Sequence, residues 1–167
     1  VLDTLKSNRF VFKENINAVY VNYNKQLKMG IMFQAGLRAE NTHSKGNSTG
    51  FQEKNGSLIP YDSTFTRSYT DVFPSAAVTF NKNPMKMWTI SYSRRIDRPA
   101  YQDLNPFEFK LNEYTFMKGN TMLKPQYTNS IDITHIYKYK LTTKLTFSHV
   151  KDIFAQLPDT TDKTKAF

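Results

Sequence analysis

The side chains that could perform catalysis are few, and their spacing matches no catalytic or metal-binding motif. The three histidines, His43, His135 and His149, lie far apart, and none belongs to a His-Glu-x-x-His pattern. The chain has no cysteine, which excludes a thiol nucleophile, a cysteine-based zinc site and a disulfide scaffold. It also lacks a Gly-x-Ser-x-Gly nucleophile turn and a phosphate-binding loop. We therefore expect neither an enzyme nor a bound cofactor or metal.

The carboxylates offer no recognisable acid–base pair either. Glu14, Glu40 and Asp132 fall in strand-like segments, and two of them have a basic neighbour, Lys13 or Arg38. Glycoside hydrolysis needs two carboxyl groups held at a defined separation, which this sequence does not identify. We expect these groups to form ion pairs on a water-facing surface.

The net charge of +9 does not by itself indicate a nucleic-acid partner. The 23 Lys and Arg residues are scattered among 14 Asp and Glu residues, without a block of five like charges. The densest basic cluster is interrupted by Asp97 and consists of Arg94, Arg95 and Arg98. No segment fits the aromatic motif of an RNA-recognition domain. We expect no nucleic-acid binding.

Residues 26–40 show the clearest hydrophobic pattern. Their odd positions are all apolar, and their even positions are polar or Gly apart from Met32. This alternation predicts a strand with one apolar and one polar face. A strand tilted across a bilayer needs about 9–11 residues, so this one is long enough to cross. The mean hydropathy of −0.58 is compatible with such strands, because their two faces average out.

The same alternation predicts six strands and no helix, joined by turns of very unequal length. The other strands are expected at 10–23, 71–81, 86–95, 126–137 and 141–148. Short turns are expected near residues 24, 83 and 139, and long loops over about 41–67 and 97–124. Strict alternation of short and long connections is typical of an antiparallel up-and-down transmembrane β-barrel, whose short turns are periplasmic and whose long loops are extracellular.

A barrel of this kind assigns the two faces of each strand. An Arg on the lipid side costs about 2–4 kcal/mol near the membrane midplane, so the polar face must point inward. The predicted inward residues, which contact a plug or line a solute path, are Lys28, Gln34, Arg38, Glu40, Ser91, Ser93 and Arg95. The predicted lipid-facing residues are Leu27, Met29, Ile31, Phe33, Leu37, Trp88, Ile90, Tyr92, Leu145 and Phe147. Aromatic residues beside the short turns predict an interfacial girdle, namely Tyr20, Tyr23, Trp88, Tyr137 and Tyr139.

Several motifs resemble those of one membrane-protein family. They are Gly-Leu-Arg-Ala-Glu at 36–40, Tyr-Thr-Asp-Val-Phe-Pro-Ser at 69–75, and the stretch 90–99 that runs into Leu-Asn-Pro-Phe at 104–107. The last is 119–126, where Thr121 and Gln126 replace the usual Pro and Glu. In order and spacing, the chain resembles the barrel of TonB-dependent receptor-like outer-membrane proteins of the Bacteroidetes type.

The resemblance implies a fold, a location and partners. It implies that residues 1–167 are a partial barrel domain, about six strands of a roughly 22-stranded barrel with a plugged lumen. The chain lacks an initiator Met and a signal peptide, and we interpret residues 159–167 as a cut inside an extracellular loop. The plug and the TonB-recruiting segment would lie elsewhere.

The implied function is TonB-dependent uptake of a scarce nutrient, such as a metal chelate, glycan or peptide, across the bacterial outer membrane. The long loops would capture the solute. The implied partners are membrane lipid and the TonB complex, and a surface lipoprotein stays open. Two alternatives remain: a non-transport outer-membrane barrel with an adhesive or structural role, and a soluble ligand-binding β-barrel or sandwich.

Overall fold

The computed structural model describes residues 7–54, 57–83, 85–111 and 115–158. Six strands form one antiparallel sheet in the order β1-β2-β3-β4-β7-β8. Their bounds are β1 Asn8–Leu27, β2 Ile31–Lys54, β3 Ser57–Asn83, β4 Lys86–Asp97, β7 Gln126–Tyr137 and β8 Leu141–Lys151. A separate two-stranded sheet pairs β5 (Glu108–Lys110) with β6 (Phe116–Lys118), and two short 3₁₀ turns occupy Lys28–Gly30 and Tyr101–Leu104.

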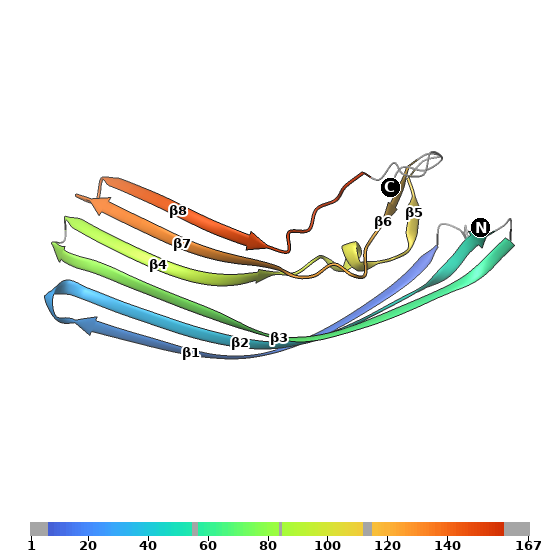
Figure 1. Cartoon of the computed structure of the whole chain (residues 1–167), viewed down its shortest axis with the longest axis horizontal. Coiled ribbons are helices and arrows are strands. Elements are labelled where there is room, and N and C mark those ends of the chain that lie inside the picture. The colour runs from blue at the N-terminus through green and yellow to red at the C-terminus, as the bar shows by residue number, and fades with distance from the viewer. Residues whose placement is uncertain (1–6, 55–56, 84, 112–114, 159–167) are drawn as a thin grey trace.

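The sheet is curved and open, and it confirms the predicted all-β antiparallel fold. Each strand of the main sheet pairs with its neighbour in an up-and-down order, with only the 98–125 connection inserted between β4 and β7. Figure 1 shows that β1, β2 and β3 continue well past the ends of β4, β7 and β8, and that the β5–β6 hairpin lies on the concave side. The described residues contain no helix long and apolar enough to cross a membrane.

The two later short turns lie where the sequence predicts them, but the first does not. β3 pairs with β4 around residues 83–86, and β7 pairs with β8 from Tyr137 and Leu141 outward. The predicted turn near residue 24 is wrong, because β1 continues to Leu27 and the chain turns at Lys28–Gly30. Leu27 pairs directly with Ile31, so both residues lie on the same face of the sheet. The alternation of apolar and polar residues therefore continues through the three-residue turn without a break. The pattern therefore could not reveal the turn.

The predicted loop over 41–67 is also wrong. β2 and β3 keep an unbroken one-to-one register from Ile31 and Phe80 to Lys54 and Ser57. β3 alone has 27 residues, more than twice the number that a bilayer-spanning strand needs. Residues 41–54 contain only one large apolar residue, Phe51, so no apolar alternation marks this half of the hairpin as a strand. We call the paired segments 41–54 and 57–71 the outer ribbon.

The described residues of the second long connection, 98–111 and 115–125, form an ordered cover rather than an open loop. They contain the Tyr101–Leu104 turn and the β5–β6 hairpin. Leu104 and Phe107 of this connection are buried. The expected chain cut at 159–167 lies outside the described residues.

Gly30 gives a test of the first turn. Its φ is +72°, and a Cβ there would lie 2.5 Å from the backbone oxygen of Asn81. Gly30→Ala is expected to lower the free energy of unfolding by about 1–2 kcal/mol, since an L residue is disfavoured in the left-handed region. Urea titration of the intact protein in lipid vesicles measures this. Met29 has a φ of 67°, so Met29→Asn serves as the control and should be tolerated. Equal effects of the two substitutions would contradict the assignment of this turn.

Candidate functional site

The strand register collects small polar side chains into rows on one face of the sheet. One row crosses all six strands and consists of Asn22, Gly36, Ser75, Ser93, Ser130 and Ser148. The predicted inward residues of the strands share this face: Gln34, Arg38, Glu40, Ser91, Ser93 and Arg95. Lys28 does not, because it lies in the first turn. We call this surface the polar face.

The opposite face carries an apolar band. One row consists of Phe33, Val78, Ile90, Ile133 and Leu145. The other predicted apolar residues of these strands lie on the same face: Ile31, Leu37, Trp88, Tyr92 and Phe147. Leu27 ends β1 beside Ile31, whereas Met29 lies in the turn.

The aromatic residues do not all follow the predicted girdle. Trp88 stacks on His135 with ring centroids 4.1 Å apart, close to the second and third turns. Tyr137 ends β7 at the third turn, and Tyr139 lies within that turn. Tyr20 is wrongly placed by the prediction: it pairs with Arg38 on the polar face, well before the actual first turn. Its assignment depended on the misplaced turn near residue 24.

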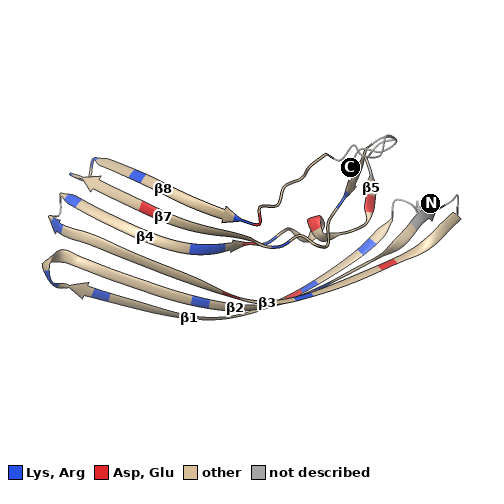
Figure 2. Cartoon of the chain, in the orientation of Figure 1, with Lys and Arg blue, Asp and Glu red and all other residues tan. Residues whose placement is uncertain are grey.

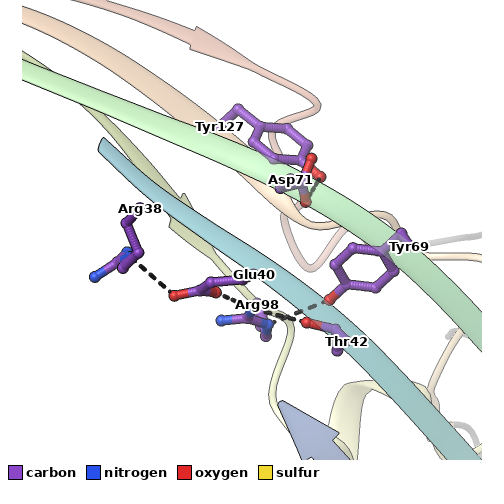
Figure 3. A network of polar contacts seen from close by, with 7 residues as sticks. All are labelled: Arg38, Glu40, Thr42, Tyr69, Asp71, Arg98 and Tyr127. Carbon is purple, nitrogen blue, oxygen red and sulfur yellow. Dashed lines mark hydrogen bonds and ion pairs between the residues drawn. The ribbon is translucent and has the colours of Figure 1, made fainter. Parts of the chain in front are cut away.

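A network of charged and polar groups sits on the polar face where the outer ribbon begins (Figure 3). Glu40 is buried, and its carboxylate contacts Arg38 Nε at 2.9 Å and the guanidinium of Arg98 at 2.7 Å. Arg98 also donates to Thr42 Oγ1 at 3.1 Å and to Tyr69 Oη at 3.2 Å. Burial alone would lower the pKa of Arg98, but its bonds to Glu40 and Tyr69 outweigh this and raise it. Arg98 therefore ties the start of the connection to the sheet as a permanent cation.

A second set of contacts holds the connection further along the ribbon. Asn105 Oδ1 accepts a hydrogen bond from Ser48 Oγ at 2.9 Å, and Asn105 Nδ2 donates to Asn8 Oδ1 at 2.9 Å. Ser48 is fully buried beneath this contact. Arg67 donates to two backbone carbonyls of the connection, those of Thr121 and Leu123. The connection is thus anchored to all three strands of the extended part of the sheet.

Gly119 closes the connection on itself, and its substitution gives a prediction. Its N–H donates to the Asn105 carbonyl at 2.9 Å, and a Cβ would meet that oxygen and the Asp103 oxygen at 2.6 Å. Gly119→Ala is expected to lower the free energy of unfolding by about 1–2 kcal/mol, because backbone atoms must shift. Limited proteolysis of the intact protein should also cut residues 98–125 faster.

Gly36→Ala is the matched control for this test, because its Cβ would meet only the side-chain oxygens of Ser75 and Asn22. These side chains can rotate away. If Gly36→Ala loosened the connection as much as Gly119→Ala, the closure at Gly119 would not be what holds it.

A pocket of about 400 Å³ opens beside the network, and three arginines line it. They are Arg38, Arg94 and Arg95, and the other lining residues are Tyr20, Asn22, Gly36, Leu37, Phe73, Ser75 and Ser93. No carboxylate lines it. Nε of Arg94 is buried without a hydrogen-bond partner. The pocket is therefore a cationic surface with an unsatisfied donor beside it.

Arg94 lies against the ring of Tyr127. Its guanidinium lies 5.1 Å from the centroid of the Tyr127 ring, whose hydroxyl donates to Asp71 Oδ2 at 2.7 Å. Among the described residues no group of three or more His, Cys, Asp or Glu could hold a metal ion.

Sequence reasoning assigned Arg38 and Glu40 to one polar face but missed their partners. Arg98, Tyr127 and Arg94 were not predicted as site residues, since hydrophobic period says nothing about which distant strands meet. The Arg98-Pro99 pair at a strand end was interpreted as part of a basic cluster and of the 90–99 motif, and neither interpretation indicated a contact with Glu40.

Comparisons with known proteins agree with this architecture. The model of the outer membrane protein beta-barrel family matches residues 1–167, the whole chain. Searches of curated proteins and of solved structures give no significant match. The chain thus belongs to the outer membrane protein beta-barrel family, and its place is the bacterial outer membrane.

Proposed function

We propose that the protein containing this chain is a TonB-dependent transporter that takes up a scarce nutrient across the outer membrane. The chain contributes part of the barrel wall, with its apolar band toward lipid and its polar face toward the lumen. The motifs that resemble TonB-dependent receptors support this, as do two opposed faces of opposite polarity. Transport of this kind needs no covalent chemistry in the barrel, which accords with the lack of catalytic motifs.

The observation that carries the proposal is the arginine-lined pocket beside the network that anchors the folded-in connection. A porin needs an open lumen, whereas here residues 98–125 lie over the polar face and are anchored at Glu40, Ser48 and Arg67. The pocket offers cationic donors with no lining carboxylate. Fixed guanidinium groups favour carboxylate or phosphate groups, so the nutrient is expected to carry an anionic group.

The partners follow from this mechanism. Membrane lipid surrounds the apolar band, and the TonB complex would act on a plug encoded outside these 167 residues. A surface lipoprotein that helps capture the solute would contact the outer ribbon.

Deletion of the complete gene, with and without TonB, tests the proposal. Uptake of labelled metal chelates, glycans and peptides should fall on deletion and return only when the gene and TonB are both present. Uptake that persists without TonB would indicate a porin. Unchanged uptake of all three classes would indicate an adhesive or structural barrel, whereas the soluble alternative is excluded by family membership and location.

The outer ribbon is the observation that favours an adhesive role as the second candidate. It extends beyond the apolar band and exposes Phe51, Leu58 and Ile59 near its end. Exposed apolar clusters mark interaction sites. Loss of cell adhesion on deletion, with unchanged uptake, would support this second function.

A further inference from the structure

Six lysines gather at the short-turn end of the sheet. The pairs Lys25 and Lys28, Lys82 and Lys86, and Lys138 and Lys140 belong to the first, second and third turns. All six are exposed, and within the described part of the chain none forms an ion pair. Figure 2 shows basic residues at this end of every hairpin. We call the six residues the lysine rim.

No carboxylate accompanies the lysine rim. Residues 15–39, 72–96 and 133–151, which contain the three turns and the strands around them, include no Asp or Glu. The acidic residues that pair with basic groups, Glu40 and Asp132, lie further along the strands. A solvated surface usually intersperses both signs, so an unbalanced rim points to an external anion.

Aromatic rings lie at the same level as the lysine rim. The Tyr137 ring has Lys86 Nζ at 5.8 Å and Lys138 Nζ at 5.2 Å from its centroid. Trp88, half exposed, follows Lys86 by two residues and begins the apolar band of β4. Amphipathic rings favour the boundary between acyl chains and headgroups, which sets the depth of this level in the membrane.

We propose that the lysine rim binds the phosphate groups of anionic phospholipids in the periplasmic leaflet. The short turns of outer-membrane barrels lie on the periplasmic side, so the rim meets a leaflet of phospholipid. Two residues of strand span about 7 Å, so a lysine that flanks Trp88 lies at headgroup depth. A long lysine side chain places its stem along the apolar surface and its ammonium among the phosphates. The bound lipids would fix the depth and tilt of these hairpins.

Lipid retention by the intact, detergent-purified protein tests the proposal. Native mass spectrometry would measure bound phosphatidylglycerol, with phosphatidylcholine and free inorganic phosphate as comparison probes. In a rim variant, Lys82, Lys86, Lys138 and Lys140 are all replaced by Gln. Four removed charges are expected to reduce bound phosphatidylglycerol by about tenfold or more, with little change for phosphatidylcholine.

A matched variant keeps the same change in net charge away from the lysine rim. Lys13, Lys45, Lys118 and Lys124 are exposed and lie outside it, and their replacement by Gln should leave lipid retention unchanged. Replacing the four rim lysines by Arg, which preserves the charge, should retain the lipid. If the variant with all four Lys→Gln substitutions does not assemble, two double variants, at 82 and 86 and at 138 and 140, cover that outcome. Each double variant should retain about threefold less phosphatidylglycerol than wild type.

Three results would overturn the proposal. One is equal loss of phosphatidylglycerol in the rim and matched variants, which would indicate a net-charge effect. Another is unchanged retention of phosphatidylglycerol in the rim variant, which would indicate that the lysines bind a soluble acidic partner instead. The third is equal competition by free phosphate, which would show an anion site without lipid. None of them depends on whether the protein transports a solute.

Discussion

Val78→Arg is expected to lower the free energy of unfolding in lipid vesicles by about 2–4 kcal/mol, the cost of Arg on the lipid face of a barrel near the midplane. Val78 lies in the middle of the apolar row, between Phe33 on β2 and Ile90 on β4. The substituted guanidinium would face acyl chains with no partner charge on that row. Assembly of the intact protein into the outer membrane should fall with its stability.

Ala77→Arg is the control for this prediction, one residue away on the same strand. Ala77 pairs with Gln34 and Ser91 on the polar face, where an Arg meets water and polar side chains. Urea titrations of both variants, compared with wild type, measure the difference directly. If Ala77→Arg were as costly as Val78→Arg, or more so, the assignment of the two faces would be reversed.

Glu40→Ala is expected to lower the free energy of unfolding by about 2–3 kcal/mol. This is below the full range for a buried ion pair because part of Arg98 is exposed. The carboxylate is the shared partner of Arg38 and Arg98, and its removal leaves two cations facing each other on the polar face. The start of the 98–125 connection should then detach. Hydrogen exchange of residues 98–107 in the intact protein should rise together with the loss of stability.

Lys144→Ala provides the comparison, since it removes an ion pair of an exposed lysine with Asp132 on the same face of the sheet. It should change stability little, because exposed pairs contribute little. The double variant Glu40→Leu with Arg98→Met should recover part of the loss, since no unpaired charge is left buried. Were Glu40→Ala as mild as Lys144→Ala, or without effect on hydrogen exchange, the network would not anchor the connection.

Where one face of a strand is apolar, the sequence sufficed to predict the strand. The last two strands of the sheet, β7 and β8, lie at 126–137 and 141–151, close to the predicted 126–137 and 141–148. The outer ribbon was not predicted because it lacks such a continuous apolar face. Segment 41–54 contains one large apolar residue, Phe51, and the covered face of this ribbon is lined by small polar residues such as Thr42 and Ser48. Hydrogen bonding between strands, not side-chain pattern, continues the sheet there.

The first turn illustrates a different limit. A three-residue turn joins Leu27 to Ile31 with both residues on one face, so the period of two passes through it without a break. Hydrophobic period reports which face a residue occupies, and it does not report where the chain reverses. Tyr20 was assigned to an interfacial girdle on the strength of that misplaced turn, and the register instead places it in the arginine-lined pocket.

The sequence by itself determined the fold class, the segregation of polar and apolar faces, two of the three short turns and the absence of a catalytic motif. These follow from local physics, since a strand between lipid and water must alternate every second residue. Only the tertiary structure decided that Arg98 reaches Glu40 across 58 positions, that Arg94 lines a pocket with Arg38, and that the 98–125 connection covers the polar face. Such contacts depend on strand order and curvature, which bring together residues whose separation along the chain carries no period.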